Sequence, residues 1–212
     1  GKPTITDQSE PARVAEVVKK MNLKHVVLTS VDRDDIKDDF GATIWANTIN
    51  EIRKTSPECT IEVLTPDFQG YEPALNIVFD AKPDIFSHNV ECVERISKQV
   101  RAQANWERSL EVLRKSVKFG LLTKSGIMVG LGETDDEVLA TMLQAAELVF
   151  KIFTIGQYLQ PSNNNLPVDR YVDSETFSMY KSEGLKMGFD VIESGPLVRS
   201  SYHADEQAKL IL

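Results

Sequence analysis

The chain has 212 residues, of which 42% are hydrophobic and 26% are charged, close to the averages for globular domains. Its net charge of −8 disfavours nucleic acid as a partner, because binding to phosphates needs a basic face. There is no apolar run of about 18 residues or more, and the N-terminal sequence has no apolar signal-peptide core. We therefore expect a cytoplasmic protein with one domain, 1–212, and no membrane partner.

The first half of the chain alternates amphipathic helices with short apolar strands. Ser9 can cap a first helix, with Pro11 in its first turn. Four apolar residues of this helix recur at helical spacing and would face a core: Val14, Val17, Val18 and Met21. Three apolar runs that end in polar residues predict buried strands: 25–31, 60–65 and 85–89. The helices predicted in this half run through 45–52 and 74–78 and over about 106–118.

The second half continues the alternation. Thr134 and Glu137 form a capping box that begins a helix. Four residues of that helix would point inward: Val138, Met142, Ala145 and Val149. Gly188 is a plausible C′ residue for a helix over 174–187. The strands predicted here are 125–131, 153–159 and 189–192, and a C-terminal tail follows from about 194 to 212.

Short apolar strands that alternate with helices imply parallel βαβ units, with helices covering the sheet. Five or six units suggest a partial α/β barrel, and a doubly wound sheet is the competing arrangement. Polar residues at the carboxyl ends of successive strands favour the barrel, because the loops at that rim build active sites. These strand ends are Thr29/Ser30/Asp32, Thr65/Asp67, His88/Asn89/Glu91, Gly130/Gly132/Glu133 and Gln157/Tyr158. The predicted fold is an α/β, partial parallel (β/α)6-type TIM-like barrel.

Six specific strings occur in order along the chain: 30–35 (SVDRDD), 66–68 (PDF), 88–91 (HNVE), 123–133 (TKSGIMVGLGE), 156–161 (GQYLQP) and 199–202 (RSSY). Together they resemble the lipoyl synthase family of radical S-adenosylmethionine (SAM) enzymes, from Gly1 to about Ala204. The resemblance implies two 4Fe–4S clusters. One binds SAM and cleaves it to a 5′-deoxyadenosyl radical, and the auxiliary cluster donates sulfur to C6 and C8 of a protein-bound octanoyl chain.

The same resemblance implies the partners. They are octanoylated lipoyl carrier domains, namely the acyltransferase subunits of 2-oxoacid dehydrogenases and the H protein of the glycine cleavage system. A reductant such as ferredoxin or flavodoxin is implied as well.

The cysteines depart from the family pattern. In the family the SAM cluster is held by a Cys-x3-Cys-x2-Cys loop after the first strand, and the auxiliary cluster by three upstream cysteines and a serine of the Arg-Ser-Ser-Tyr segment. Both cysteine motifs would precede Gly1, and Cys59 and Cys92 match neither of them. Because thiolates are the usual ligands, we expect the chain to bind neither cluster tightly. It is interpreted as a fragment of the enzyme without the first strand and cluster loop, or as a truncated relative without activity.

The C-terminal segment carries the implied metal ligand. By resemblance Ser201 is the oxygen ligand of the auxiliary cluster, and Ser200 is the alternative. Without the family, either hydroxyl could simply cap a turn. Arg199 is expected to steer the same tail, or else to form a surface ion pair.

SAM binding needs carboxylates or amides for the ribose and ammonium, and a cation or backbone N–H for the carboxylate. Five residues at strand ends have this chemistry: Thr29, Asp32, Asn89, Glu91 and Lys124. Lys124 directly precedes its predicted strand and could instead be a surface lysine, and Asp32 could instead help to hold Arg33 in a loop network. Gln157 and Tyr158 could contact SAM or the octanoyl chain, or could be packing residues. The 130–133 turn would give room near the adenine.

Other residues have plainer expectations. His88 has no second histidine or carboxylate at ligand spacing, so a hydrogen-bonded structural role is predicted. His203 is expected to lie in a mobile tail. Asparagines at 163–165 and the 38–41 segment replace residues common in the family, which puts carrier and SAM binding in doubt.

Two other classes of function are the alternatives to a lipoyl synthase. The first is a non-catalytic barrel that binds SAM or a lipoyl carrier, which follows if the upstream cysteines are absent. The second, a barrel hydrolase or aldolase, lacks support, because the sequence has no G-x-S-x-G or HExxH motif and no recognisable Schiff-base lysine.

Overall fold

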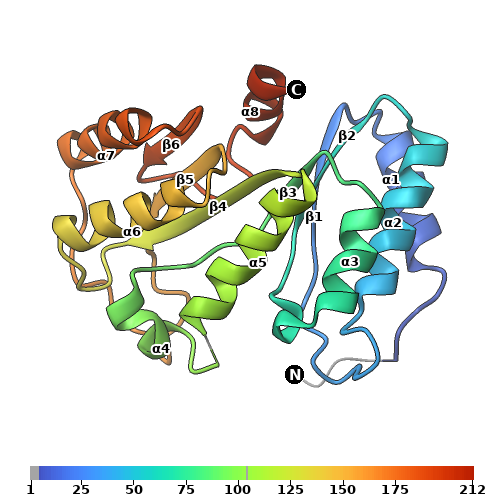
Figure 1. Cartoon of the computed structure of the whole chain (residues 1–212), viewed down its shortest axis with the longest axis horizontal. Helices are drawn as coiled ribbons and strands as arrows, with labels where there is room; N and C mark the ends of the chain where they lie inside the picture. The colour runs from blue at the N-terminus through green and yellow to red at the C-terminus, as the bar shows by residue number, and fades with distance from the viewer. Residues whose placement is uncertain (1–4, 104) are drawn as a thin grey trace.

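The computed structural model describes residues 5–103 and 105–212 (Figure 1). Six parallel strands form one sheet: β1 (His25–Thr29), β2 (Thr60–Leu64), β3 (Ile85–Ser87), β4 (Leu122–Val129), β5 (Ile152–Gln157) and β6 (Val191–Gly195). Their order in the sheet is their order in the chain, β1-β2-β3-β4-β5-β6. A doubly wound sheet would reverse its order at one point, and this sheet does not. The predicted α/β partial parallel barrel is therefore confirmed.

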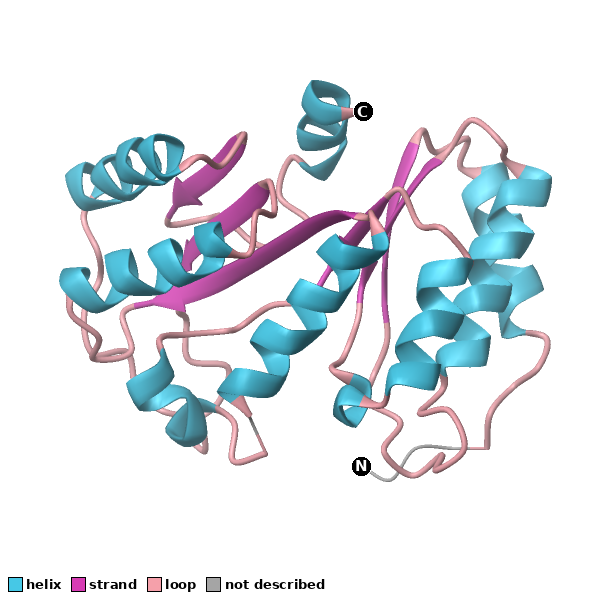
Figure 2. Ribbon diagram, viewed as in Figure 1, coloured by secondary structure: helices cyan, strands magenta, loops and turns pink. Residues whose placement is uncertain are grey.

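Helices connect the strands and cover the outer face of the curved sheet. They are α1 (Glu10–Lys20), α2 (Ala42–Thr55), α3 (Glu72–Asp80), α5 (Trp106–Phe119), α6 (Asp135–Glu147) and α7 (Ser174–Met187). The loops after β2 and β3 contain the short elements η1 (Phe68–Gly70), η2 (Glu94–Ile96) and α4 (Ser97–Val100). Figure 2 shows α8 (Ala204–Ile211) apart from these layers, at the open side of the sheet between β6 and β1.

Local sequence signals set several helix boundaries. Thr134 Oγ1 accepts a hydrogen bond from the Glu137 N–H (3.2 Å), and the Glu137 carboxylate accepts one from the Thr134 N–H (2.9 Å). This reciprocal pair is the predicted capping box. Gly188 ends α7 at φ 103°, the left-handed conformation that glycine adopts without strain. Ser9 is the N-cap residue of α1 as predicted, but its hydroxyl bonds to Asp7 instead of capping the helix.

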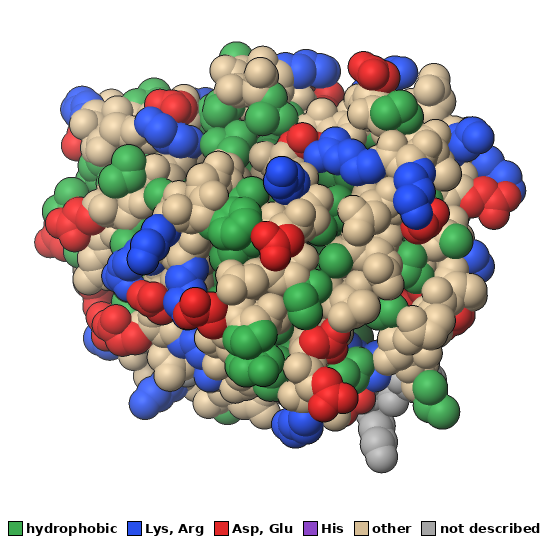
Figure 3. Space-filling view, turned by 45° about the vertical axis from the view of Figure 1, so that its right-hand side comes forward, with side chains coloured by type: hydrophobic (Ala, Val, Ile, Leu, Met, Phe, Trp, Pro, Cys, Tyr) green, Lys and Arg blue, Asp and Glu red, His purple; other side chains and the backbone are tan. Residues whose placement is uncertain are grey.

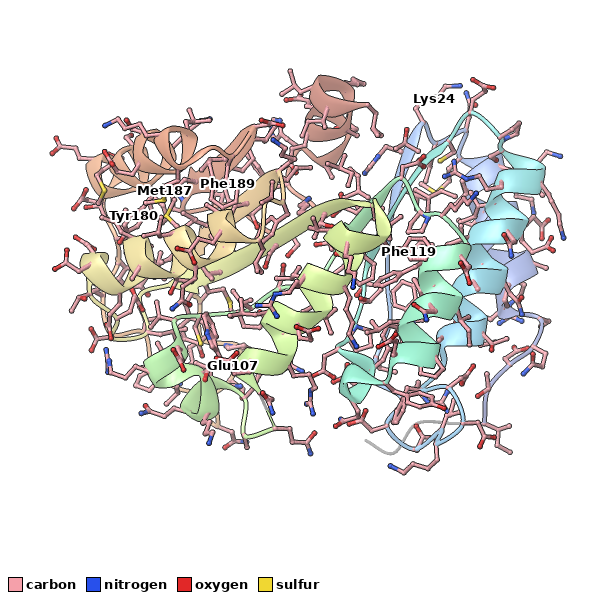
Figure 4. All side chains as sticks on the ribbon, in the orientation of Figure 1. Lys24, Glu107, Phe119, Tyr180, Met187 and Phe189 are labelled. Carbon is pink, nitrogen blue, oxygen red and sulfur yellow. The ribbon has the colours of Figure 1, made fainter. Side chains whose placement is uncertain are left out.

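The outer face of the sheet carries two apolar clusters, one joining β1–β3 to α1–α3 and the other joining β4–β6 to α5–α7. In the second cluster Phe153 and Phe189 stack with ring centroids 5.4 Å apart. Tyr180 of α7 is fully buried in the same cluster, and Figure 4 labels Tyr180 and Phe189 in this part of the molecule. Aromatic burial of this kind holds the helices against the strands.

Three residues predicted to face the core are exposed. Val17 is 52% exposed, Met21 63% and Val149 66%. Met21 and Val149 lie beyond the last residues of α1 and α6, so the helical periodicity no longer applies to them. Val17 lies on α1 over a shallow groove beside β1, where the described residues form no further strand that could cover it.

The strand boundaries shift from the predicted ones in a way that affects the site. β4 begins at Leu122, three residues before the predicted start at 125, and β1 ends at Thr29 instead of residue 31. The predicted C-terminal tail, 194–212, contains the helix α8. In the parts of the chain that the structure describes, no helix is long and apolar enough to cross a membrane. Figure 3 shows acidic and basic side chains interspersed on one face, with no continuous field of either sign there.

Candidate functional site

The loops at the carboxyl ends of the strands are tied together by polar side chains. The Gln69 amide nitrogen donates to Asp34 (2.8 Å), which joins the loop after β2 to the loop after β1. Arg108 of α5 donates to Asp67 (2.7 Å) and to the Gln69 amide oxygen (3.0 Å). These bonds cross-link three segments that are remote in sequence, and they hold one side of the rim in a fixed shape.

Two of the predicted SAM ligands, Asp32 and Glu91, lie on either side of one arginine. The Arg101 guanidinium is 3.5 Å from Asp32 and 3.9 Å from Glu91. Burial raises the pKa of the Glu91 carboxyl, and the Asp32 charge raises it further although Arg101 opposes both. Glu91 also has φ 73°, a conformation that costs a non-glycine residue free energy and that is frequent at functional sites. No sequence motif pointed to Arg101.

A cavity of about 110 Å³ lies inside the barrel next to this pair. Asn89, Glu91 and Met128 line it together with the two glycines Gly126 and Gly156, and residues 198–200 form a further wall. Asn89 Oδ1 is buried and accepts no hydrogen bond from any described residue. An orphaned buried acceptor beside a carboxylate and two glycines can receive a ligand that presents hydroxyl or ammonium donors.

Thr29 is not brought to this cavity. It lies at the exposed end of β1 and lines a different hollow of about 320 Å³, between β1, α1 and α2. Asn89 and Glu91 thus share one cavity, and Arg101 links Asp32 to Glu91, while Thr29 faces another cavity.

Lys124 lies inside the barrel and not at the rim. It is the third residue of β4 and is fully buried, with Nζ 2.9 Å from Glu62 Oε1. His25 of β1 approaches the same carboxylate at 3.8 Å. The prediction that Lys124 precedes its strand is wrong, and so is the surface alternative, because β4 begins earlier than its apolar run suggests.

Gln157 and Tyr158 hold the loop that follows β5. The Gln157 amide nitrogen donates to the carbonyls of Tyr158 and Arg170 (both 3.0 Å), and its oxygen accepts from the Val172 N–H (2.9 Å). The Tyr158 hydroxyl donates to the Leu166 carbonyl (2.8 Å). Of the two roles left open by the sequence, this geometry favours packing over contact with a ligand.

Gln157→Leu is expected to lower the free energy of unfolding by about 1–3 kcal/mol. The substitution leaves the partly buried Arg170 carbonyl and Val172 N–H without their partner, and an unpaired group that is shielded from water costs free energy. Urea unfolding followed by circular dichroism measures the change. Gln144→Leu on the exposed face of α6 is the control and should stay within about 0.5 kcal/mol of the parent. Equal stabilities for the two variants would contradict the assigned role.

The turn after β4 is closed by its own acidic residue. The Glu133 carboxylate accepts from the N–H groups of Gly130 (2.7 Å) and Leu131 (2.9 Å). A Cβ atom at Gly130 would lie 2.3 Å from the Gln157 amide nitrogen, and its φ of 97° also favours glycine. Arg170 lies 3.7 Å from Glu133. The turn is therefore a fixed backbone support, whatever ligand it faces.

The C-terminal segment reaches the cavity through Ser200. The Asn89 amide nitrogen donates to Ser200 Oγ at 2.7 Å, while Arg199 donates to the Val198 carbonyl at 2.6 Å. Ser201 is exposed and lines another open hollow together with His25. The two serines of the predicted ligand motif are thus in different environments.

The remaining histidines have ordinary partners. His88 is buried, with Nδ1 2.9 Å from the Thr65 carbonyl and Nε2 3.1 Å from Ser109 Oγ, and burial lowers its pKa. Its predicted hydrogen-bonded role is confirmed. His203 precedes α8 and bonds to Glu206 at 2.7 Å, which raises its pKa. It lies directly before the first turn of α8, and its mobility stays a prediction.

The described residues offer no site for an iron–sulfur cluster. No group of three or more histidine, cysteine, aspartate or glutamate side chains among residues 5–103 and 105–212 could hold a metal ion. Cys59 and Cys92 are buried and free. Burial raises the pKa of both thiols, that of Cys92 to about 12, which disfavours the thiolate form that ligates iron.

Comparison of the sequence with known proteins identifies its relatives. Residues 1–145 match the family model described as "Radical SAM superfamily". The lipoyl synthase of Rubrobacter xylanophilus is 54% identical over 211 residues, which cover 99% of this chain and 65% of the relative. The lipoyl synthase of Parabacteroides distasonis is 53% identical over 206 residues, covering 97% and 73%. The chain thus spans about two thirds to three quarters of the length of these relatives.

Comparison of the fold with solved structures finds similar folds at low sequence identity. SuiB of Streptococcus suis bound to S-adenosylmethionine has a TM-score of 0.72 at 8% identity, covering 98% of this chain and 47% of that one. Methylornithine synthase has a TM-score of 0.65 at 11% identity, covering 94% and 66%. At such identities the likeness concerns the fold.

Proposed function

The chain belongs to the lipoyl synthase family of the radical SAM superfamily, and we propose on this premise that it forms the catalytic barrel of a lipoyl synthase. The reaction proposed is sulfur insertion at C6 and C8 of a protein-bound octanoyl group. The observation that carries the proposal is the 53% identity over nearly the whole chain to a lipoyl synthase of which the chain covers 73%.

SAM is the cofactor proposed for the barrel cavity. Asn89 Oδ1 would accept from a ribose hydroxyl or the ammonium group, and Glu91 and Asp32 supply negative charge beside it. Arg101, which these two carboxylates share, is a cation within reach of a ligand carboxylate. When bound and reduced, SAM supplies the 5′-deoxyadenosyl radical. The protein's part is to orient it and to keep water out.

The clusters of the family do not fit the residues of this chain, and we derive no step through them. The relatives are longer, and we propose that the thiolate ligands belong to the part of such a protein that this chain does not match. Ser201 and Arg199 are proposed to contribute from the C-terminal segment. The partners proposed are octanoylated carrier domains and a reductant such as ferredoxin or flavodoxin, in the cytoplasm.

Anaerobic incubation of the 212-residue chain with iron and sulfide is expected to leave it colourless. Its two thiols are buried with raised pKa values, and no other described group can replace them as ligands. Iron analysis and the absorption spectrum after desalting give the result. Binding of about four irons per chain with the broad absorption of a 4Fe–4S centre would show that ligands exist which the structure does not reveal.

The function itself is tested on the protein isolated from its source cells. Its intact mass shows whether it carries cysteine-rich N-terminal peptides beyond the 23.8 kDa of this chain. If it does, incubation with SAM, reductant and an octanoylated lipoyl domain should give a lipoyl product and 5′-deoxyadenosine.

A second candidate is a non-catalytic barrel that binds SAM or a lipoyl carrier, and it applies if the natural protein has no thiolate ligands beyond the two buried cysteines of this chain. A natural protein of 23.8 kDa without turnover would support it and would overturn the catalytic proposal.

A further inference from the structure

The segment after β6 enters the open side of the barrel. β1 and β6 are the two edges of the sheet and each pairs with a single neighbour, so a gap separates them. The tail segment, defined here as Val198–Tyr202, passes into this gap and leads to α8, which contacts β1. Ala208 of α8 packs in one apolar cluster with the inward residues that begin three strands: Ile85, Ile152 and Val191. Figure 4 labels Lys24, which precedes β1, on the side of the molecule where α8 lies.

Gly156 of β5 provides a close-fitting contact for the tail segment. A Cβ atom at this position would lie 2.2 Å from the Val198 carbonyl oxygen and 3.2 Å from Arg199 Nη1. Gly156 has no positive φ, so its backbone conformation does not require glycine. The close approach of the tail segment is therefore the reason that the structure offers for glycine here.

Asn89 at the end of β3 provides the polar contact. Its amide nitrogen donates to Ser200 Oγ at 2.7 Å, across a sequence separation of 111 residues. Val198, Arg199 and Ser200 line the same cavity as Asn89 and Glu91. The tail segment is thus a wall of the candidate site.

We propose that Asn89 and Gly156 are positioning residues that dock the tail segment in the barrel and thereby fix where Ser201 lies relative to the cavity. Gly156 admits the main chain at Val198, and Asn89 fastens it two residues later at Ser200, directly before Ser201. The role of Ser201 as a cluster ligand rests on the proposed function. The docking of the tail segment does not, because it involves only residues of this chain.

Hydrogen–deuterium exchange of the full 212-residue chain tests the docking. The reporters are the N–H groups of Val198 and Tyr202, which bond to the Gly195 carbonyl (3.1 Å) and the Arg199 carbonyl (2.8 Å). Asn89→Ala should speed their exchange by about 2- to 10-fold, the effect of one net hydrogen bond. Ser200→Ala should give the same increase, and the double variant no more, because each change removes the same bond. Asn89→Asp should stay near the parent rate, since the Ser200 hydroxyl can donate to a carboxylate.

Gly156→Ala removes the other contact and should speed exchange of the same amides by more than Asn89→Ala does. Asn50→Ala on the exposed face of α2 is the matched control and should leave them unchanged. Peptides from β2 and α3 report whether a variant has unfolded. If Gly156→Ala does not fold, the Asn89 and Ser200 cycle decides alone.

Independent effects of Asn89→Ala and Ser200→Ala, which multiply in the double variant, would overturn the pairing. Parent-like exchange in Asn89→Ala would overturn the docking even in a protein that makes lipoyl product. Conversely, a coupled pair in a protein without lipoyl synthase activity would leave the docking intact and count against the proposed function only.

Discussion

Lys124→Met is expected to lower the free energy of unfolding by about 3–5 kcal/mol, the largest stability change we predict for this protein. Both partners of the Lys124–Glu62 pair have no exposed side-chain surface, and their charged atoms are 2.9 Å apart. Methionine preserves much of the volume but leaves the Glu62 carboxylate buried without its cation. His25, at 3.8 Å, is the nearest remaining side chain that could carry positive charge. Urea unfolding at neutral pH measures the loss.

A double variant separates the loss of the pair from the loss of packing. Glu62→Leu with Lys124→Met removes both charges, and it should regain much of the stability, because replacing a buried pair by apolar residues is often neutral. Lys181→Met on the exposed face of α7 is the matched control, with an expected change within about 0.5 kcal/mol. A Lys124→Met variant as stable as this control would show that Glu62 finds water or another partner inside the barrel.

The same lysine shows why the order of the strands could be predicted but not the start of β4. Buried parallel strands are apolar runs, so each strand was visible in the sequence as such a run between helical patterns. Thr123 and Lys124 are polar but buried, so their polarity led us to start the predicted strand only at residue 125. Lys124 can be buried because its ammonium group pairs with Glu62, which lies 62 residues earlier in the chain. No local pattern contains that information.

Some residues of the candidate site could likewise be predicted from the sequence, and others could not. Asn89 and Glu91 were predicted because they follow a strand, and the structure brings both to one cavity. Gln157 also lies at the end of a strand, but its side chain bonds to backbone groups of a loop. The sequence could not predict this side-chain direction. Arg101 was missed because it lies between elements and meets its carboxylates only through tertiary contacts. The position of a residue along a strand thus predicts that it lies at the rim of the barrel. Which side chains it contacts there depends on how the loops pack.

Ser201→Ala is expected to abolish sulfur insertion in a protein that carries this barrel behind the N-terminal segment of a related lipoyl synthase. If Ser201 is the oxygen ligand that the family implies, product formation should fall by roughly 100-fold or more, because even groups that only support a metal ligand change activity by about 10- to 100-fold. Formation of 5′-deoxyadenosine should continue, since the residues proposed for SAM lie at the cavity and not at Ser201. Mass spectrometry of the carrier peptide and chromatography of the nucleoside measure both.

Ser200→Ala is the control variant that shows whether the loss of activity is specific to Ser201. Ser200 accepts the Asn89 hydrogen bond in the barrel, whereas the Ser201 hydroxyl is exposed and has no such bond to Asn89. Ser200→Ala removes the Asn89 bond but leaves the Ser201 hydroxyl in place, so it should slow sulfur insertion only by about 2- to 10-fold through a less firmly docked tail segment. The reverse order, with Ser200→Ala the inactive variant, would assign the ligand to Ser200 and would require the Asn89 bond to break during turnover. Equal lipoyl product from parent and Ser201→Ala proteins would remove Ser201 from the mechanism.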